Sequence, residues 1–374
     1  MNAIEILTVR KKDDLYKKGT LEKAERIELI SFNENEFQVV CQKDLYQIGD
    51  RVLYVYPDFN LTENELFDSF IKSGKLGSNN RIRAIKFNFV TQDMIDRGSL
   101  NTVFSNGIAL PLSEVYDFLN DQLLCEENLG ITKISQESNT LRVSGKTYAW
   151  PNNLYKTDED NIKKVAHRIK FPITLHGTLK MDGGSVTFGW MDGEPFIGSR
   201  NVKKQIYKKV VVEKRSKKWY EHLVFWKKVD LNIYEEVVNT DDIYVELAYP
   251  LLMKIKDRGN LICRGELVGS GNKGSGNRNN PHAKIASKIY IYDMNGLVNN
   301  NWVKINPNIT ERYCEKFGFE HVPVFFNKQF ETYEDLMQEC ELIFSTNMIE
   351  GIVVRNYDNS FSCKIMNDEY DSKK

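Results

Sequence analysis

Alternating apolar and polar residues dominate the first part of the chain, from residue 1 to about residue 110. The segment 37–57 (FQVVCQKDLYQIGDRVLYVYP) alternates on both sides of Gly49 and Asp50, which predicts two strands joined by a turn. The segment 81–90 (RIRAIKFNFV) predicts one more strand, with its basic residues on one face. Several short strands at this spacing predict a small antiparallel barrel.

A second β-rich pattern begins near Phe171, after a more helical and polar connector. Its expected strands lie within 172–183, 184–193, 194–200, 260–269, 288–294, 351–356 and 360–366. Apolar residues at helical spacing follow Thr332, and the acidic residues Glu334 and Asp335 predict the first turn of a helix over 332–347. The chain is therefore expected to fold as α+β with antiparallel sheets, in two domains over residues 1–150 and 151–374.

Composition narrows the possible partners. The net charge of the 374 residues is −1, so a nucleic acid would have to be held by a local basic patch. The six cysteines are scattered without a C-x-x-C pair, which argues against zinc and disulfides and predicts a reducing, cytoplasmic compartment. The charged N-terminus does not resemble a signal peptide, and no apolar run is long enough to span a membrane, so no membrane partner is expected.

The stretch 179–190 (LKMDGGSVTFGW) places Lys180 and Asp182 at the mouth of a predicted hairpin. Taken alone, Lys-x-Asp-Gly is more often a solvated charged turn than a site. Five further short motifs follow it in the chain, and each is expected to place a polar or aromatic group near a strand end, where a rigid scaffold can aim it into a cleft. They occupy residues 199–201, 264–266, 290–293, 350–355 and 361–366.

Together these residues suit nucleotidyl transfer. A lysine amine attacks phosphorus only when it is unprotonated, and the cations Arg200 and Lys364 would favour that form and stabilise phosphate charge. Glu350 suits Mg²⁺ held through water. Glu266 can accept hydrogen bonds from ribose hydroxyls, and Tyr292 offers a ring on which adenine can stack.

The motifs KMDG, GSRN, RGELVG, IYIYDM, EGIVVRN and FSCKIMN resemble motifs I, Ia, III, IIIa, IV and V of the covalent nucleotidyltransferase superfamily. That superfamily comprises ATP-dependent DNA and RNA ligases and capping guanylyltransferases. The resemblance implies ATP, with Mg²⁺ or Mn²⁺, as cofactors. It also implies a role for each matching residue: Lys180 as the nucleophile that forms lysyl–AMP, Asp182 and Arg200 for the adenylate and the RNA phosphate, Glu266 for ribose, Tyr292 for the base, Glu350 for the metal and Lys364 for the α-phosphate.

The order of domains indicates which member the chain resembles. DNA ligases and capping enzymes carry an OB domain after motif V, whereas only ten residues follow Lys364 here. The N-terminal part is instead similar to RNA ligases with an amino-terminal OB module. The resemblance thus implies an OB-fold β-barrel with a helical connector in 1–150, then an ATP-grasp-like nucleotidyltransferase (adenylation) domain in 151–374.

The implied reaction is ATP-dependent joining of RNA 3′-OH and 5′-phosphate ends in RNA repair, by a monomer acting on nicked or duplex RNA. A DNA ligase or a capping-type guanylyltransferase is the alternative, and a non-catalytic nucleic-acid-binding relative is a further one. The sequence departs from the superfamily at Leu179, where a glutamate is usual, and at Ser362, where a lysine is usual. His176 is expected to be an ordinary strand residue, because the register that would make it part of motif I puts Thr174 in place of the lysine.

Three remaining signals lie outside these motifs. The G-x-G-x-x-G at 269–274 leads into GSGNRNNP rather than a helix, so a loop is expected there and not a dinucleotide site. The basic and aromatic segment 203–228 predicts either a helix packed through Trp219, Leu223, Trp226 and Ile233 or an RNA-backbone patch. The basic face of 81–86 is a second candidate patch.

Overall fold

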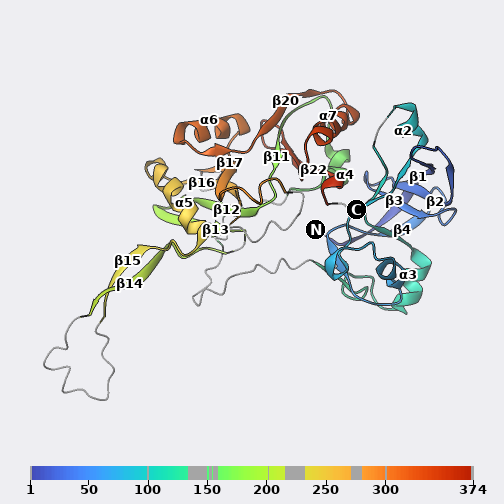
Figure 1. The fold of residues 1–374 in the computed structure, drawn as a ribbon, viewed down its shortest axis with the longest axis horizontal. Coiled ribbons are helices and arrows are strands. Elements are labelled where there is room, and N and C mark those ends of the chain that lie inside the picture. Colours follow the sequence, from blue (N-terminus) through green and yellow to red (C-terminus); the bar gives the residue numbers. More distant parts are fainter. Residues whose placement is uncertain are drawn as a thin grey trace, which may run out of the picture.

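The computed structural model describes residues 2–98, 101–133, 150, 154, 159–200, 202–214, 232–270, 280–299 and 301–371. Figure 1 shows an N-terminal unit of strands (residues 2–133) beside a larger C-terminal unit of sheets and helices (residues 159–371). The domain boundary predicted near residue 150 stays a prediction, because most residues around it are not among those described. Within the described ranges, no helix is long and apolar enough to cross a membrane.

The N-terminal unit is built on an antiparallel sheet in the order β3-β2-β1-β4-β9, with β7 also paired to β1. Its strands are β1 (Ile4–Lys17), β2 (Lys23–Phe32), β3 (Gln38–Gln42), β4 (Arg51–Val55), β7 (Phe89–Val90) and β9 (Ile108–Pro111). The two edges approach each other, because Asn106, just before β9, donates its backbone N–H to the carbonyl of Gln38 on β3 (2.8 Å). Tyr54 and Tyr56 pack edge to face in the core of this unit.

The expected continuous strand over 81–90 is wrong. The range holds two short strands, β6 (Ile85–Lys86) and β7, which pair with different partners, β8 (Phe104–Ser105) and β1, while Arg81 forms an isolated bridge with Asn60. A tight turn separates the two, since the N–H of Phe89 donates to the carbonyl of Phe87 (2.8 Å). The strands predicted around Gly49 and Asp50 are confirmed as β3 and β4.

The rest of the N-terminal unit is made of short elements. They are β5 (Phe59–Leu61) paired with β10 (Ile131–Lys133), and the helices α1 (Asp68–Lys72), α2 (Gln92–Asp96) and α3 (Leu112–Leu119).

The C-terminal unit holds two larger antiparallel sheets, each with its own hydrophobic core. The first, in the order β20-β11-β21-β22, consists of β20 (Val324–Phe330), β11 (Ile173–Lys180), β21 (Gly351–Arg355) and β22 (Ser362–Met366). The second, in the order β13-β12-β16-β17-β18, consists of β13 (Glu194–Ser199), β12 (Gly184–Met191), β16 (Leu261–Val268), β17 (Lys288–Val298) and β18 (Asn301–Lys304). A short β19 (Glu320–His321) pairs in parallel with β17.

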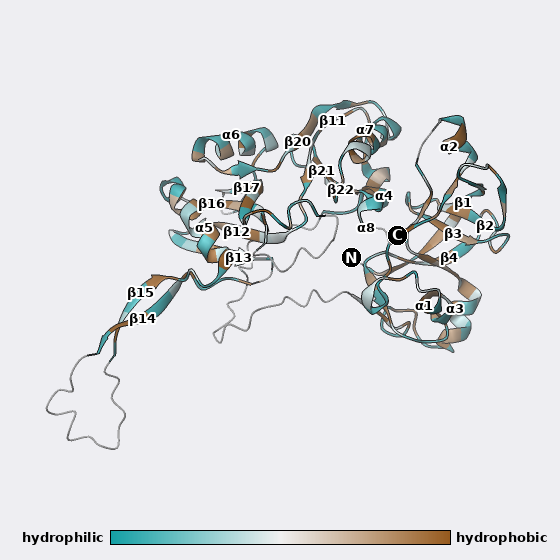
Figure 2. Cartoon of the chain, in the orientation of Figure 1, coloured by the Kyte–Doolittle hydropathy of each residue, from teal (hydrophilic) through white to brown (hydrophobic). Residues whose placement is uncertain are grey.

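Helices cover these sheets. Helix α7 (Tyr333–Thr346) packs on the first sheet and begins with a capping box between Thr332 and Asp335, which confirms the predicted helix start. Helices α5 (Ile243–Lys254) and α6 (Pro307–Phe317) pack on the second sheet. Two short helices, α4 (Ile162–Val165) and α8 (Asp368–Asp371), lie between the two units in Figure 2. The mixed fold with antiparallel sheets is therefore as predicted.

The Lys-x-Asp-Gly stretch is not the mouth of a hairpin, contrary to the prediction. Strand β11 pairs with β20 and β21, whereas β12 pairs with β13 and β16, so residues 181–183 cross from one sheet to the other. Lys180 is the last residue of β11 and lies at the junction of the two sheets.

Strands β14 (Tyr207–Lys214) and β15 (Asn232–Val238) form a two-stranded arm that projects from the C-terminal unit (Figure 1). Ile233 lies on β15, so the helix proposed to include it is wrong at that position. Trp219, Leu223 and Trp226 lie outside the described residues, as does most of the loop predicted at 269–274.

Candidate functional site

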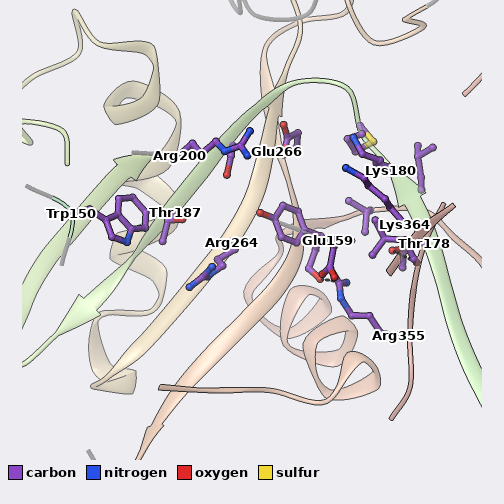
Figure 3. Close-up of a pocket in the computed structure, with 16 residues that line it drawn as sticks. Trp150, Glu159, Thr178, Lys180, Thr187, Arg200, Arg264, Glu266, Arg355 and Lys364 are labelled. Atoms are coloured by element: carbon purple, nitrogen blue, oxygen red, sulfur yellow. Dashed lines mark hydrogen bonds and ion pairs between the residues drawn. The ribbon is translucent and has the colours of Figure 1, made fainter. Parts of the chain in front are cut away.

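A cavity of about 230 Å³ opens where the two C-terminal sheets meet. Five of the seven residues predicted for the site line it: Lys180, Arg200, Glu266, Tyr292 and Lys364. Figure 3 shows Lys180 and Lys364 on one side of this cavity and Arg200 with Glu266 on the other. The other two predicted residues, Asp182 and Glu350, adjoin Lys180, as described below.

The register of the first sheet explains how its residues reach the cavity. Thr178 on β11 pairs with Val353 on β21, which pairs with Lys364 on β22. Directly paired residues face the same side of a sheet. The row therefore presents three side chains from three strands to the cavity, and Lys180 follows two residues after Thr178 on the same face.

Lys180 is held by an ion pair. Its Nζ donates to Oε1 of Glu350 at 2.6 Å, and both side chains are largely buried. The main chain brings them together, because Lys180 pairs with Gly351 in the sheet. Burial raises the pKa of Glu350, and the charge of Lys180 opposes that shift. The candidate nucleophile is thus fixed at the end of its strand by the carboxylate of the residue that precedes β21.

The crossing after Lys180 is clamped at Asp182. Its Oδ2 accepts a hydrogen bond from the hydroxyl of Tyr370 (2.8 Å), and its backbone carbonyl accepts one from Nδ2 of Asn280 (2.8 Å). Gly183 allows the close approach of β16, since a Cβ there would lie 2.5 Å from the carbonyl oxygen of Leu267. The glycine of the motif thus lets the lysine loop lie against the second sheet.

The second sheet contributes Glu266 through its pairing with Ser185. Burial raises the pKa of Glu266 to about 8, with Lys180 acting against the shift and Glu350 adding to it. The charges of Lys180 and Glu350 thus act on Glu266 across the junction of the two sheets.

Tyr292 reaches the cavity through a β-bulge. Between Arg264 and Gly265 on β16, the facing strand β17 carries one extra residue, because Ile291 pairs with Gly265 and Asp293 with Arg264. A bulge re-aims the side chain of the strand that contains it. Arg355 supports this position by donating from Nη1 to the backbone carbonyl of Tyr292 (3.1 Å).

Glu159 is a site residue that the sequence analysis missed. It lines the cavity, and its carboxylate accepts hydrogen bonds from Nη2 of Arg355 (3.4 Å) and from the hydroxyl of Ser362. The main chain next to it runs along β22, where the N–H of Lys364 donates to the carbonyl of Asp160 (2.8 Å). Ser362, the departure from the usual lysine, therefore has a partner of its own. Only the acidic run TDED at 157–160 marks this position in the sequence.

The prediction that each site motif places its residue near a strand end is wrong for three of the residues. Arg200 follows the end of β13 and Glu350 precedes β21, as expected, but Glu266, Tyr292 and Lys364 lie inside strands. They reach the cavity because it lies between two sheet faces rather than at one sheet edge. His176 is a buried residue of β11, as predicted, and burial lowers its pKa to about 4.

The carboxylate of Glu350 has an oxygen suited to a metal ion. Its Oε2 is buried and has no hydrogen-bond partner within the described residues. An unsatisfied carboxylate oxygen next to Lys180, which lines the cavity, fits a hydrated divalent cation. The described residues contain no cluster of three or more His, Cys, Asp and Glu side chains suited to a metal. Glu350 is therefore suited to a divalent cation that keeps most of its water ligands.

A model of the RNA ligase family matches residues 173–367, just over half of the 374-residue chain. The chain belongs to the RNA ligase family. The match covers all the predicted site residues, from Lys180 to Lys364. Membership of the RNA ligase family implies that the chain binds RNA as its substrate, and it agrees with the nucleotidyltransferase resemblance found in the motifs.

Solved structures support the fold over almost the whole length of this RNA ligase family chain. The structure of a Naegleria gruberi RNA ligase with PPi is 18% identical, with a TM-score of 0.68 over 99% of this chain and 98% of that one. A mutant of the same ligase with ATP and Mn has a TM-score of 0.69 at 17% identity, over the same shares. A further mutant with AMP and Mn has 0.67 at 18%, over 98% of this chain and 97% of that one. No curated protein sequence gives a significant match.

Proposed function

We propose that the chain is an ATP-dependent RNA ligase whose nucleophile is Lys180. The observation that carries the proposal is the position of Lys180, paired with Glu350 at 2.6 Å beside a cavity lined by Arg200 and Lys364. The fold of ligases solved with ATP and Mn supports the same choice of nucleotide and metal.

In the first step, the neutral amine of Lys180 attacks the α-phosphorus of ATP. A nitrogen–phosphorus bond forms, the bond from the α-phosphorus to the oxygen that bridges it to the β-phosphate breaks, and pyrophosphate leaves with that oxygen; the attacking nitrogen, which becomes positively charged as it bonds, then releases one proton to solvent. Arg200 and Lys364 stabilise the charge on the phosphate oxygens. The product is lysyl–AMP.

Two further transfers complete the ligation. The 5′-phosphate of the RNA attacks the lysyl–AMP phosphorus, which frees Lys180 and produces an adenylated RNA end. The RNA 3′-OH then attacks the 5′-phosphorus, forms the phosphodiester and releases AMP. The same cations serve each step, because each step passes charge onto phosphate oxygens at one place.

The remaining residues bind and orient. Glu266 would hold the ribose hydroxyls, Tyr292 the face of adenine, and Asp182 the adenylate. Glu350 would hold Mg²⁺ or Mn²⁺ through water. When bound there, the cation would supply positive charge that disfavours the ammonium form of the lysine and offsets phosphate charge.

The N-terminal unit would serve as an OB module that contacts RNA. Its six-stranded sheet and the bond from Asn106 to Gln38 that links the two edges support a barrel. The candidate patch at 81–86 is partly engaged, since Arg81 pairs with Asp58 and Lys86 with Glu369. In the segment 203–228, Lys204 pairs with Asp242 and Lys208 with Asp241, so both segments stay candidates for binding the RNA backbone.

We also propose joining of nicked or duplex RNA by a monomer in the cytoplasm, in RNA repair. The six cysteines are free thiols, which is compatible with a reducing compartment.

A sealing assay tests the proposal against its alternatives. The protein is incubated with Mg²⁺ or Mn²⁺, with ATP or GTP, and with 5′-labelled nicked RNA, hybrid or DNA duplexes. We expect sealing of RNA with ATP, and a transient adenylated 5′ end. Transfer of GMP to RNA would identify a capping-type enzyme, preference for a DNA nick a DNA ligase, and RNA binding with no product a non-catalytic relative.

A further inference from the structure

The chain segment after β22 returns to the nucleophile. Asn367 follows β22 directly, and its backbone N–H donates to the carbonyl of Glu350 (2.9 Å). Its side-chain Nδ2 donates to the carbonyl of Ile349 (3.0 Å), and its Oδ1 accepts from the N–H of Glu369 (3.1 Å). The buried Asn367 thus ties the start of α8 to the residue that pairs with Lys180.

Tyr370 on α8 contacts Asp182, which follows Lys180 by two residues in the chain. Tyr370 is only 2% exposed, and its hydroxyl donates to Oδ2 of Asp182 at 2.8 Å. Asp182 stands two residues after Lys180, in the three-residue crossing between the sheets. The C-terminal segment therefore contacts both residues that flank the lysine in space, Glu350 through the main chain and Asp182 through a side chain.

The outer side of the same segment is held from two directions. Nζ of Lys86, in the N-terminal unit, lies 2.5 and 2.6 Å from the two carboxylate oxygens of Glu369. Nζ of Lys163 on α4 lies 2.7 Å from Oδ2 of Asp368 and 3.0 Å from Oδ1 of Asn106. These interactions restrain the main chain of α8 and therefore the position of Tyr370 next to Asp182.

We propose that Tyr370 is a positioning residue of the adenylation site, which holds the carboxylate of Asp182 in the orientation that lysyl–AMP formation requires. The inference rests on the proposed function of Lys180. A charge-assisted hydrogen bond from a buried phenol restricts the rotation of the carboxylate, and positioning errors of about 1 Å near reacting groups cost large factors in rate. The segment 367–370 is then part of the site, although no motif marks it.

The first test is the substitution Tyr370→Phe, which removes the hydroxyl and keeps the ring. Its matched control is Tyr357→Phe, which removes a hydroxyl bonded to Asn327 outside the cavity. We expect the single-turnover rate of adduct formation at saturating ATP to fall about tenfold in Tyr370→Phe, the usual effect of removing one hydrogen bond to a charged group. The KM for ATP and the Tm should stay close to those of the wild type, and the control should keep its rate.

A double-mutant cycle separates positioning from a general packing effect. If Tyr370 acts through Asp182, then Tyr370→Phe adds less than about twofold to the reduction in rate already caused by Asp182→Ala. If the two reductions multiply instead, or if Tyr370→Phe alone leaves the rate unchanged, the proposal is overturned.

Amide hydrogen exchange supplies a readout that does not depend on activity. Peptides that span residues 181–184 should exchange faster in Tyr370→Phe than in the wild type, with no change in Tyr357→Phe. Equal exchange in Tyr370→Phe and wild type would overturn the role of Tyr370. A wild type that forms no adduct would overturn the proposed function instead, while the exchange measurement would still decide whether Tyr370 holds the crossing.

Discussion

Nζ of Lys180 lies 2.6 Å from Oε1 of Glu350, which makes the candidate nucleophile one half of a largely buried ion pair. The other oxygen of Glu350 has no hydrogen-bond partner within the described residues. One carboxylate thus holds the lysine and still has an oxygen available for a hydrated cation. Under the proposed function, a cation bound at Glu350 would compete with Lys180 for this carboxylate and so disfavour the ammonium form of the lysine.

The first prediction concerns Glu350. The substitution Glu350→Gln keeps the shape of the side chain but removes its charge, so both the partner of Lys180 and the metal ligand are weakened. We expect adduct formation with ATP to slow about 100-fold, the typical effect of removing one preorganised electrostatic group. A titration with Mg²⁺ should also shift to higher concentrations. A normal rate with a normal Mg²⁺ dependence would contradict this role.

The second prediction concerns Glu159. The substitution Glu159→Gln weakens its bond to Arg355, which supports the backbone of Tyr292, so binding of the base should suffer. We expect the KM for ATP in adduct formation to rise about tenfold with little change in the limiting rate. Ser362→Ala removes only the neutral donor to Glu159 and is the matched control, with a smaller effect. A fall in the limiting rate at constant KM would argue for a role in chemistry instead.

The third prediction concerns the pH dependence of stability. The folded pKa of Glu266, about 8, lies above its ordinary value of 4.5, so the folded state binds more protons than the unfolded state between these pH values. The free energy of unfolding should therefore fall as the pH rises through this window, at most by about 1.4 kcal/mol for each unit of pKa difference. Glu266→Gln removes the ionisable group, so the Tm of this variant should rise relative to that of the wild type as the pH increases from 5 to 8.5. The exposed Glu213→Gln serves as control, and parallel Tm profiles for Glu266→Gln and wild type would refute the prediction.

The fourth prediction concerns the basic segment 203–228. Neutralising Lys214, Arg215, Lys217 and Lys218 should flatten the salt dependence of RNA binding. The logarithmic slope should change by up to about 0.7–0.9 for each RNA phosphate that the variant no longer binds. Adduct formation with ATP should survive, because Lys214 lies on the projecting arm and not at the cavity. An unchanged RNA affinity at low salt would count against an RNA patch here.

The site is largely predictable from the sequence because its chemistry is carried by short motifs. The side chains of Lys180, Arg200, Glu266, Tyr292 and Lys364 indicate their chemistry, and the structure brings all five to one cavity. The pairing of their strands is harder to predict. Lys-x-Asp-Gly has the local pattern of a turn, and a turn does not reveal whether the strands on either side pair with each other or cross between sheets.

The residues that sequence reasoning missed lie outside the six motifs, and only an acidic run at 157–160 marks one of them. Glu159 acts through Arg355 and Ser362, which are distant from it in sequence, and Tyr370 acts through Asp182. Such interactions depend on tertiary packing, which hydrophobic periodicity does not encode. The bulge at Tyr292 is equally hidden, since one extra residue in a strand leaves the alternation readable on both sides.

Mass spectrometry of the protein–nucleotide adduct shows directly whether Lys180 is the nucleophile. The protein is incubated with ATP and Mg²⁺ or Mn²⁺, digested, and its peptides are searched for an acid-labile AMP group. We predict AMP on Lys180 and no adduct in Lys180→Ala. The absence of any adduct in the wild type, or an adduct that persists in Lys180→Ala, would show that Lys180 is not the nucleophile of an adenylation reaction.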